Sequence, residues 1–263
     1  MTDRRWRRWW QIAGRVALLA AFAACGARQT TTLPPGTAQP DRYLFERGTE
    51  ALQMEKWLNA RTYLQQIVDG YPQSPFRPDA KLAVGDSYLG EGTAESVVLA
   101  ANEFREFLTF YPTNPRADYA QYKLAMSHFQ QMRAPARDQT ETKAALVDFD
   151  VFFQKFPNSP LMPDVKQHWR IARDRLSQAS YLVGLHYYRI RWYPGAIDRF
   201  REVLREDSGF TGRDAVYFYL AESLTKTDKK AEAIPYFERL LAEFDRSDHL
   251  EDARSRLEEL KNQ

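Results

Sequence analysis

The chain has 263 residues, of which 44% are apolar and 27% are charged, and its formal net charge is +2 at pH 7. This composition excludes a disordered chain, a collagen and a protein built from many membrane-spanning helices. Its single cysteine excludes an intramolecular disulfide framework and an all-cysteine zinc site.

The positive charge comes from the first 24 residues, which hold five arginines and one aspartate. Without them, acidic side chains slightly outnumber basic ones. A nucleic-acid-binding protein keeps its basic surface in the folded part of the chain. We therefore expect no nucleic-acid partner.

Residues 1–24 are predicted to be a signal peptide. The basic segment DRRWRRWW at 3–10 precedes a short apolar run that ends in small residues, at 16–24. This run is too short to cross a bilayer core of about 30 Å as a permanent helix. A basic start, a short apolar core and small residues at its end are typical of an export signal.

Residues 25–40 are predicted to be an anchor and a tether. The sequence FAAC at 22–25 resembles the bacterial lipobox, in which a cysteine after small residues receives lipid. The alternative is a buried structural cysteine, but Cys25 stands between the predicted signal peptide and a Thr/Pro/Gly-rich tract, where it has nothing to pack against. We expect a covalent lipid on Cys25 and no other cofactor or metal. Gly26 differs from the aspartate of the inner-membrane retention signal, which favours the periplasmic face of the outer membrane.

From residue 41 onward the sequence repeats with a period of about 40 residues. An aromatic-proline pair ends three of the repeated segments, at 71–72, 111–112 and 156–157, and a second proline follows three residues later. Alanine and an aromatic residue recur together before this pair, beginning with Ala60 and Tyr63. Small and large side chains at helical spacing allow two helices to pack closely, and proline ends a helix. The pattern resembles a slightly lengthened tetratricopeptide repeat.

The apolar spacing predicts eleven helices, at 41–54, 57–70, 76–90, 94–110, 116–133, 139–155, 161–190, 194–206, 212–226, 230–244 and 249–261. The helix at 161–190 is about twice as long as most of the others. We therefore predict an all-α fold, a right-handed α-solenoid of about five hairpins. The long helix should join an N-terminal lobe, 41–160, to a C-terminal lobe, 161–263.

No motif for catalysis stands out in the sequence. The chain has no glycine-rich phosphate loop, no HExxH and no GxSxG, and its four histidines lie far apart. Most carboxylates stand close to basic residues, as on solvated helix faces. We expect a protein that is not an enzyme.

Extra tyrosines suggest a peptide-binding surface. Tyr119 and Tyr122 cannot both face the same helix seam, so at least one is expected on the inner surface formed by the first helices of such repeats. Tyr88, Lys81 and Lys123 could join it. The alternative is that these side chains are solvated or lie at the edge of the core.

Several segments together resemble the BamD family of outer-membrane β-barrel assembly lipoproteins, over roughly residues 41–226. These are FYPTNPRADYAQYKLAM at 110–126, FPNSPLMPDV at 156–165 and RDRLSQASYLVGLHYYRIRWYPGAIDRF at 173–200. The resemblance implies a scaffold whose N-terminal lobe recognises unfolded outer-membrane precursors by a C-terminal signal that ends in an aromatic residue. It implies that the C-terminal lobe docks the periplasmic domains of the central barrel subunit, alongside other assembly lipoproteins.

The resemblance also concerns single residues. Tyr119 and Tyr122 match the family motif in the lobe that contacts substrate, and Arg175 matches a family arginine at the lobe junction. We expect Arg175 to help set the geometry between the lobes or toward a partner. The competing interpretation is another lipid-anchored repeat adaptor, either a coordinator of cell division or peptidoglycan synthesis or a pilotin for secretin or pilus assembly.

Overall fold

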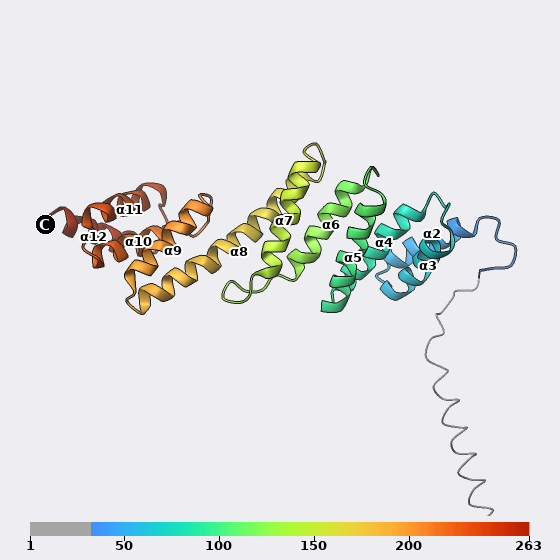
Figure 1. The fold of residues 1–263 in the computed structure, drawn as a ribbon, viewed down its shortest axis with the longest axis horizontal. Coiled ribbons are helices and arrows are strands. Elements are labelled where there is room, and N and C mark those ends of the chain that lie inside the picture. Colours follow the sequence, from blue (N-terminus) through green and yellow to red (C-terminus); the bar gives the residue numbers. More distant parts are fainter. Residues whose placement is uncertain (1–32, 263) are drawn as a thin grey trace, which may run out of the picture. The chain divides into compact units, whose positions relative to one another are not determined.

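A computed structural model describes residues 33–262, and within them the chain forms eleven α-helices and no β-strand (Figure 1). The helices are α2 (Pro40–Gln53), α3 (Trp57–Gly70), α4 (Arg77–Glu91), α5 (Ala94–Phe110), α6 (Ala117–Gln130), α7 (Thr140–Lys155), α8 (Met162–Arg189), α9 (Tyr193–Glu206), α10 (Arg213–Lys226), α11 (Lys230–Glu243) and α12 (Leu250–Lys261). Each predicted helix is present, with ends within three residues of the prediction. The all-helical fold of about five hairpins is thereby confirmed, and α12 follows the fifth hairpin.

The predicted signal peptide, Cys25 and the first part of the predicted tether lie outside the described residues. Residues 33–39 contain no helix, and α2 begins at Pro40, where proline's missing N–H costs no helical hydrogen bond. Within residues 33–262, no helix combines the length and apolar character that a bilayer crossing requires.

The chain divides inside α4 into two compact units, Met1–Ala80 and Lys81–Gln263. In the first unit, α2 packs against α3, with Leu44 and Leu64 fully buried. The rings of Phe45 and Phe76 stack with their centroids 5.1 Å apart. The Ser74 hydroxyl donates a 2.7 Å hydrogen bond to the Asp41 carboxylate, which ties the turn after α3 back to the first turn of α2.

The second unit contains three buried clusters in chain order. The first joins α4, α5 and α6, the second joins α6, α7 and the N-terminal half of α8, and the third joins the C-terminal half of α8 to α9–α12. The 28-residue helix α8 therefore contributes to two successive clusters. The predicted boundary between lobes at 160/161 remains a prediction.

The turns between hairpins share one construction. Tyr71, Tyr111, Phe156 and Phe244 each cap the C-terminus of a helix with a backbone hydrogen bond. In the second unit, Ser159 and Ser247 donate hydrogen bonds to aspartates in the first turns of α6 and α10, at 2.6 and 2.7 Å. The repeated aromatic residue thus ends the second helix of a hairpin. In three hairpins, the serine three positions later bonds back to the first turn of the first helix.

One predicted packing pair is wrong. Tyr63 is only half-buried, whereas Leu64 is fully buried in α3. Leu64, four residues after Ala60, therefore shares its buried face, and Tyr63 lies at the edge of that face.

Glycines let the helices of the α4–α5 and α8–α9 hairpins approach closely. A Cβ added at Gly184 would lie 2.7 Å from Cε1 of Phe200, and one added at Gly85 would lie 2.8 Å from the ring of Phe104. By contrast, nothing lies within 4 Å of a Cβ added at Gly70.

We expect Gly184→Ala to lower the free energy of unfolding by about 1–3 kcal/mol, because the added methyl group overpacks the contact with Phe200. The matched control, Gly70→Ala, should be stabilising by about 0.4–1 kcal/mol through lower unfolded-state entropy. Urea denaturation of both variants measures the two effects. A stabilising effect of Gly184→Ala would contradict the close contact.

Candidate functional site

The predicted peptide-binding residues lie on the first helices of the hairpins, mainly α4 and α6. Tyr119 is partly buried against the cluster that joins α4, α5 and α6. Its hydroxyl donates to the Asp86 carboxylate of α4, 2.8 Å from either oxygen. Burial and the nearby Asp86 charge raise the pKa of Tyr119 far above its ordinary value, so the phenol stays neutral and acts as a donor.

Lys123 belongs to the same group of side chains. Its Nζ lies 3.2 Å from Oδ1 of Asp86 and 5.3 Å from the centre of the Tyr119 ring. The Arg116 guanidinium carbon lies 4.7 Å from the centre of the same ring. Asp86 therefore neutralises the Lys123 ammonium group, which was expected to bind a peptide carboxylate. Lys123 and Arg116 both lie close to the Tyr119 ring.

Tyr122 packs against a different cluster, the one that joins α6, α7 and α8. Its hydroxyl lies 3.3 Å from Nδ1 of His168, which is itself 2.8 Å from the Asp164 carbonyl oxygen. Burial and the Asp164 charge raise the pKa of Tyr122. The two tyrosines thus face different seams, as their spacing predicts.

Tyr88 and Lys81 differ in accessibility. Tyr88 is half-buried and packs against the same cluster as Tyr119. Lys81 is buried, and its Nζ lies 2.8 Å from a carboxylate oxygen of both Glu103 and Glu106. Burial disfavours its charge, but the hydrogen bonds from Lys81 to these glutamates outweigh burial and raise its pKa. Lys81 is therefore a paired cation that joins α4 to α5.

Arg175 lies near the middle of α8. Its guanidinium donates a 2.8 Å hydrogen bond to the backbone carbonyl of Arg133, in the segment between α6 and α7. This contact connects the long helix to the preceding hairpin, and the role expected for Arg175 at a lobe junction stays a prediction.

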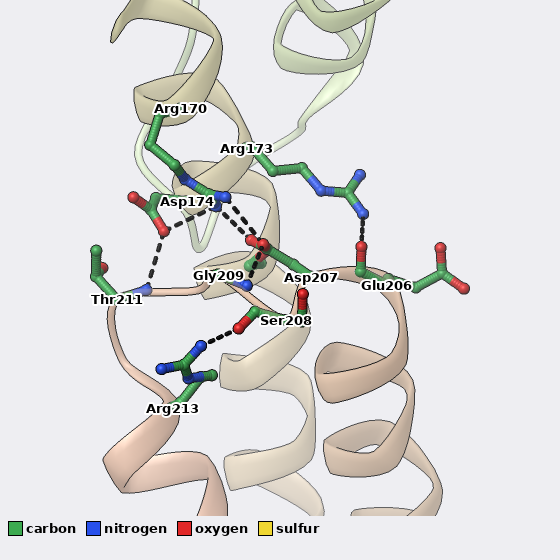
Figure 2. A network of polar contacts seen from close by, with 10 residues as sticks. Arg170, Arg173, Asp174, Glu206, Asp207, Ser208, Gly209, Thr211 and Arg213 are labelled. Carbon is green, nitrogen blue, oxygen red and sulfur yellow. Dashed lines mark hydrogen bonds and ion pairs between the residues drawn. The ribbon is translucent and has the colours of Figure 1, made fainter. Parts of the chain in front are cut away.

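A polar network that the sequence analysis missed connects α8 to the turn between α9 and α10 (Figure 2). Asp207 is buried and accepts from Arg170 and from the Ser177 hydroxyl, the latter at 2.6 Å. The backbone N–H of Gly209 also donates to it, at 3.2 Å. Arg170 in addition lies 3.0 Å from Asp174, whose carboxylate accepts from the backbone N–H of Thr211.

Burial disfavours the Asp207 charge, but the Arg170 and Ser177 hydrogen bonds outweigh it and hold the pKa of Asp207 below its ordinary value. Asp207 caps α9 at the position where Tyr71, Tyr111 and Phe156 cap other helices. The sequence signal for this network was an aspartate at the position where other repeats have an aromatic residue.

Among residues 33–262, no group of three or more His, Cys, Asp or Glu side chains is placed to hold a metal ion. Cys25 lies outside this range. The described residues of the candidate site are tyrosines and paired charges between neighbouring helices.

A family model described as "Outer membrane lipoprotein" (YfiO) matches residues 37–222, more than half of the chain. The chain belongs to this family. A tetratricopeptide repeat model also matches residues 215–247. The YfiO match covers α2–α9 and most of α10, and so includes every proposed site residue except Cys25.

Curated relatives of this YfiO-family chain carry the name "Outer membrane protein assembly factor BamD". The protein from Caulobacter vibrioides is 25% identical over 209 residues, which cover 79% of this chain and 67% of the relative. The one from Vibrio cholerae serotype O1 is 24% identical over 202 residues, covering 73% and 80%. The resemblance to the BamD family is thereby confirmed.

Two solved structures align with most of this chain at low similarity. A crystal structure of MamA protein is 15% identical, covers 80% of this chain and 98% of its own, and has a TM-score of 0.36. A tetratricopeptide repeat protein from Parabacteroides merdae is 14% identical, with coverages of 86% and 88% and a TM-score of 0.38.

Proposed function

We propose that this chain is a non-enzymatic scaffold lipoprotein of the machinery that assembles β-barrel proteins in the outer membrane. The observation that carries the proposal is the family match over residues 37–222, together with relatives named as outer membrane protein assembly factors. A lipid on Cys25 would hold the repeats at the periplasmic face, and acylation by two or more chains gives stable anchoring.

The first part of the function is recognition of unfolded precursors along α4 and α6. Tyr88, Tyr119 and Tyr122 supply aromatic surface at low conformational cost, and Lys123 lies beside the Tyr119 ring. The Asp86 hydrogen bond holds the Tyr119 hydroxyl in place, and His168 lies within 3.3 Å of the Tyr122 hydroxyl. A rigid aromatic surface of this kind can hold an extended segment without folding it.

The second part is docking of the periplasmic domains of the central barrel subunit, through the C-terminal end of α8. Val183, Ile190 and Trp192 are exposed apolar side chains there, with Ile190 57% exposed. The Trp192 ring is supported edge-on by Tyr187, with the ring centroids 4.5 Å apart. Large apolar side chains held in place on a surface are typical of the centre of an interface. Arg175, bonded to the preceding hairpin, would fix the orientation of this surface.

Recovery of partners by the tagged full-length chain from detergent-solubilised outer membranes tests the proposal. We expect to recover the central barrel subunit with its periplasmic domains. Ile190→Asp should reduce that recovery about tenfold, because it places a charge at the docking surface. Val98→Asp, at another exposed apolar position on α5, should leave recovery unchanged.

Recovery of only secretin, pilus or cell-division proteins would refute the proposal and favour another lipid-anchored adaptor. Recovery of the barrel subunit with equal loss in both variants would refute the docking surface alone.

A further inference from the structure

The lysines expected to bind a peptide carboxylate are already engaged. Lys123 is paired with Asp86, and Lys81 with Glu103 and Glu106. A carboxylate brought to either lysine must compete with acidic groups already in place. A site for a peptide carboxylate therefore requires cations elsewhere in the second unit that have no carboxylate partner.

A cleft lies over the middle of α8, where α7 and α9 flank it. In this second unit, α7 packs against the N-terminal half of α8 and α9 against the C-terminal half, as the two buried clusters show (Figure 1). Residues 173–180 of α8 line the cleft between them, and its volume is about 340 Å³. This is near the lower end of the range for small-ligand sites, about 300–1,000 Å³. Because α8 is long, α7 and α9 pack at separate positions along it, and the cleft lies between them.

The cleft combines apolar side chains with two cations to which no carboxylate is bonded. Leu176 and Val203 line it together with Lys143 and Arg173. Within residues 33–262, Lys143 has no ion pair, and the only bond of Arg173 is to the backbone carbonyl of Glu206 (Figure 2). Two cations from different helices therefore face one cleft with no carboxylate bonded to either.

The two glutamates of the cleft offset part of this charge, but neither carboxylate is bonded to Lys143 or Arg173. Glu202 is held by Arg199, with Oε2 2.8 Å from Nη1. The nearest cationic partner of the Glu206 carboxylate is Arg205, at 3.3 Å. The Ser180 hydroxyl also lines the cleft and has no hydrogen-bond partner among the described residues. The cleft thus has a net charge of +1 and offers two cations to which no carboxylate is bonded, a free hydroxyl and apolar side chains.

We propose that this cleft binds the C-terminal carboxylate of an extended peptide together with its last apolar side chain. Lys143 and Arg173 would form charge-assisted hydrogen bonds to the carboxylate, while the side chain rests against Leu176. The volume suits one chain end and not a folded domain. This inference rests on the proposed function, because it supplies the site for the last residue of the precursor signal.

Binding of a fluorescent peptide to the full-length chain tests the inference. The probe alternates apolar and polar residues, ends in phenylalanine and is made with either a free C-terminal carboxylate or an amide. We expect the free acid to bind about tenfold more tightly than the amide, since hydrogen bonds to charged groups are stronger than neutral ones. Lys143→Gln and Arg173→Gln should each reduce this preference. Lys155→Gln, a charge loss at the other end of α7, should leave it intact.

The possible outcomes separate the two proposals. If the peptide binds but acid and amide bind equally, or if the preference survives both cleft substitutions, the cleft is refuted while precursor recognition stands. If a C-terminally amidated peptide with internal aspartates competes for the cleft as well as the free acid, the site accepts acidic segments and the inference is wrong. If no peptide binds to the wild-type chain, precursor recognition fails and the inference fails with it. Circular dichroism of Arg173→Gln checks that the variant is folded.

Discussion

Asp207→Ala should lower the free energy of unfolding by about 3 kcal/mol, near the lower end of the range for breaking a buried ion pair. The Asp207 side chain is 4% exposed and receives hydrogen bonds from Arg170, Ser177 and Gly209. Its removal leaves these donors without their acceptor inside the fold. Arg170 keeps its bond to Asp174 and is 31% exposed, so the loss should not reach the upper end of the range.

Urea denaturation at about pH 7 measures this loss. Asp198→Ala is the control, because Asp198 is exposed on the same part of the chain and has no ion pair among the described residues. It should change stability by less than about 0.5 kcal/mol. An Asp207→Ala effect no larger than that of the control would show that the network does not stabilise the fold.

The isosteric variant Asp207→Asn separates charge from shape. It should cost less, about 1.5 kcal/mol, since it retains an acceptor but loses the charge that Arg170 favours. The pKa of Asp207 is lowered in the folded state, so its charge stabilises the fold above the unfolded value of about 3.9. That stabilisation is lost as the pH falls through the folded pKa. The difference between wild type and Asp207→Asn should therefore shrink in acid, and a difference that grows there would contradict the assigned charge.

The helices were predictable because their signals are local. Proline after an aromatic residue marks each of three helix ends, and Tyr71, Tyr111 and Phe156 cap those ends in the structure. Alanine at helical spacing from a large side chain marks the seam inside each hairpin. The exception at Tyr63 arose because spacings of three and four residues are both compatible with one helix face.

The charges of the site were not predictable from the sequence in the same way. Lys123 was expected to be available to a peptide, but it is paired with Asp86. Asp86 lies on α4, the first helix of the preceding hairpin. Arg170 and Asp207 are 37 residues apart, and only the packing of α8 on the following hairpin brings them together. Side-chain pairing between helices depends on their relative placement, which hydrophobic periodicity does not contain.

Phe104→Ala should be at least as damaging as the loss of Asp207, at about 3–5 kcal/mol. Phe104 is fully buried in the cluster that joins α4, α5 and α6, and its ring fills the space that Gly85 leaves open. Truncation removes the apolar contacts and leaves a cavity that two packed helices cannot easily close. In a repeat array each hairpin is stabilised by its neighbours, so the damage should extend to α6 and its tyrosines.

Phe110→Ala makes the same chemical change on the same helix, and it is the matched control. Phe110 is 67% exposed at the end of α5, so its truncation should change stability by less than about 0.5 kcal/mol. Urea denaturation measures both variants, and peptide binding by folded Phe104→Ala at low temperature reports on the α4–α6 surface. If the Phe104 effect were as small as that of Phe110, the close packing of Gly85 against the ring would not be a main source of stability. If stability fell but peptide affinity did not, the aromatic surface of α6 would not depend on the core beneath it for its geometry.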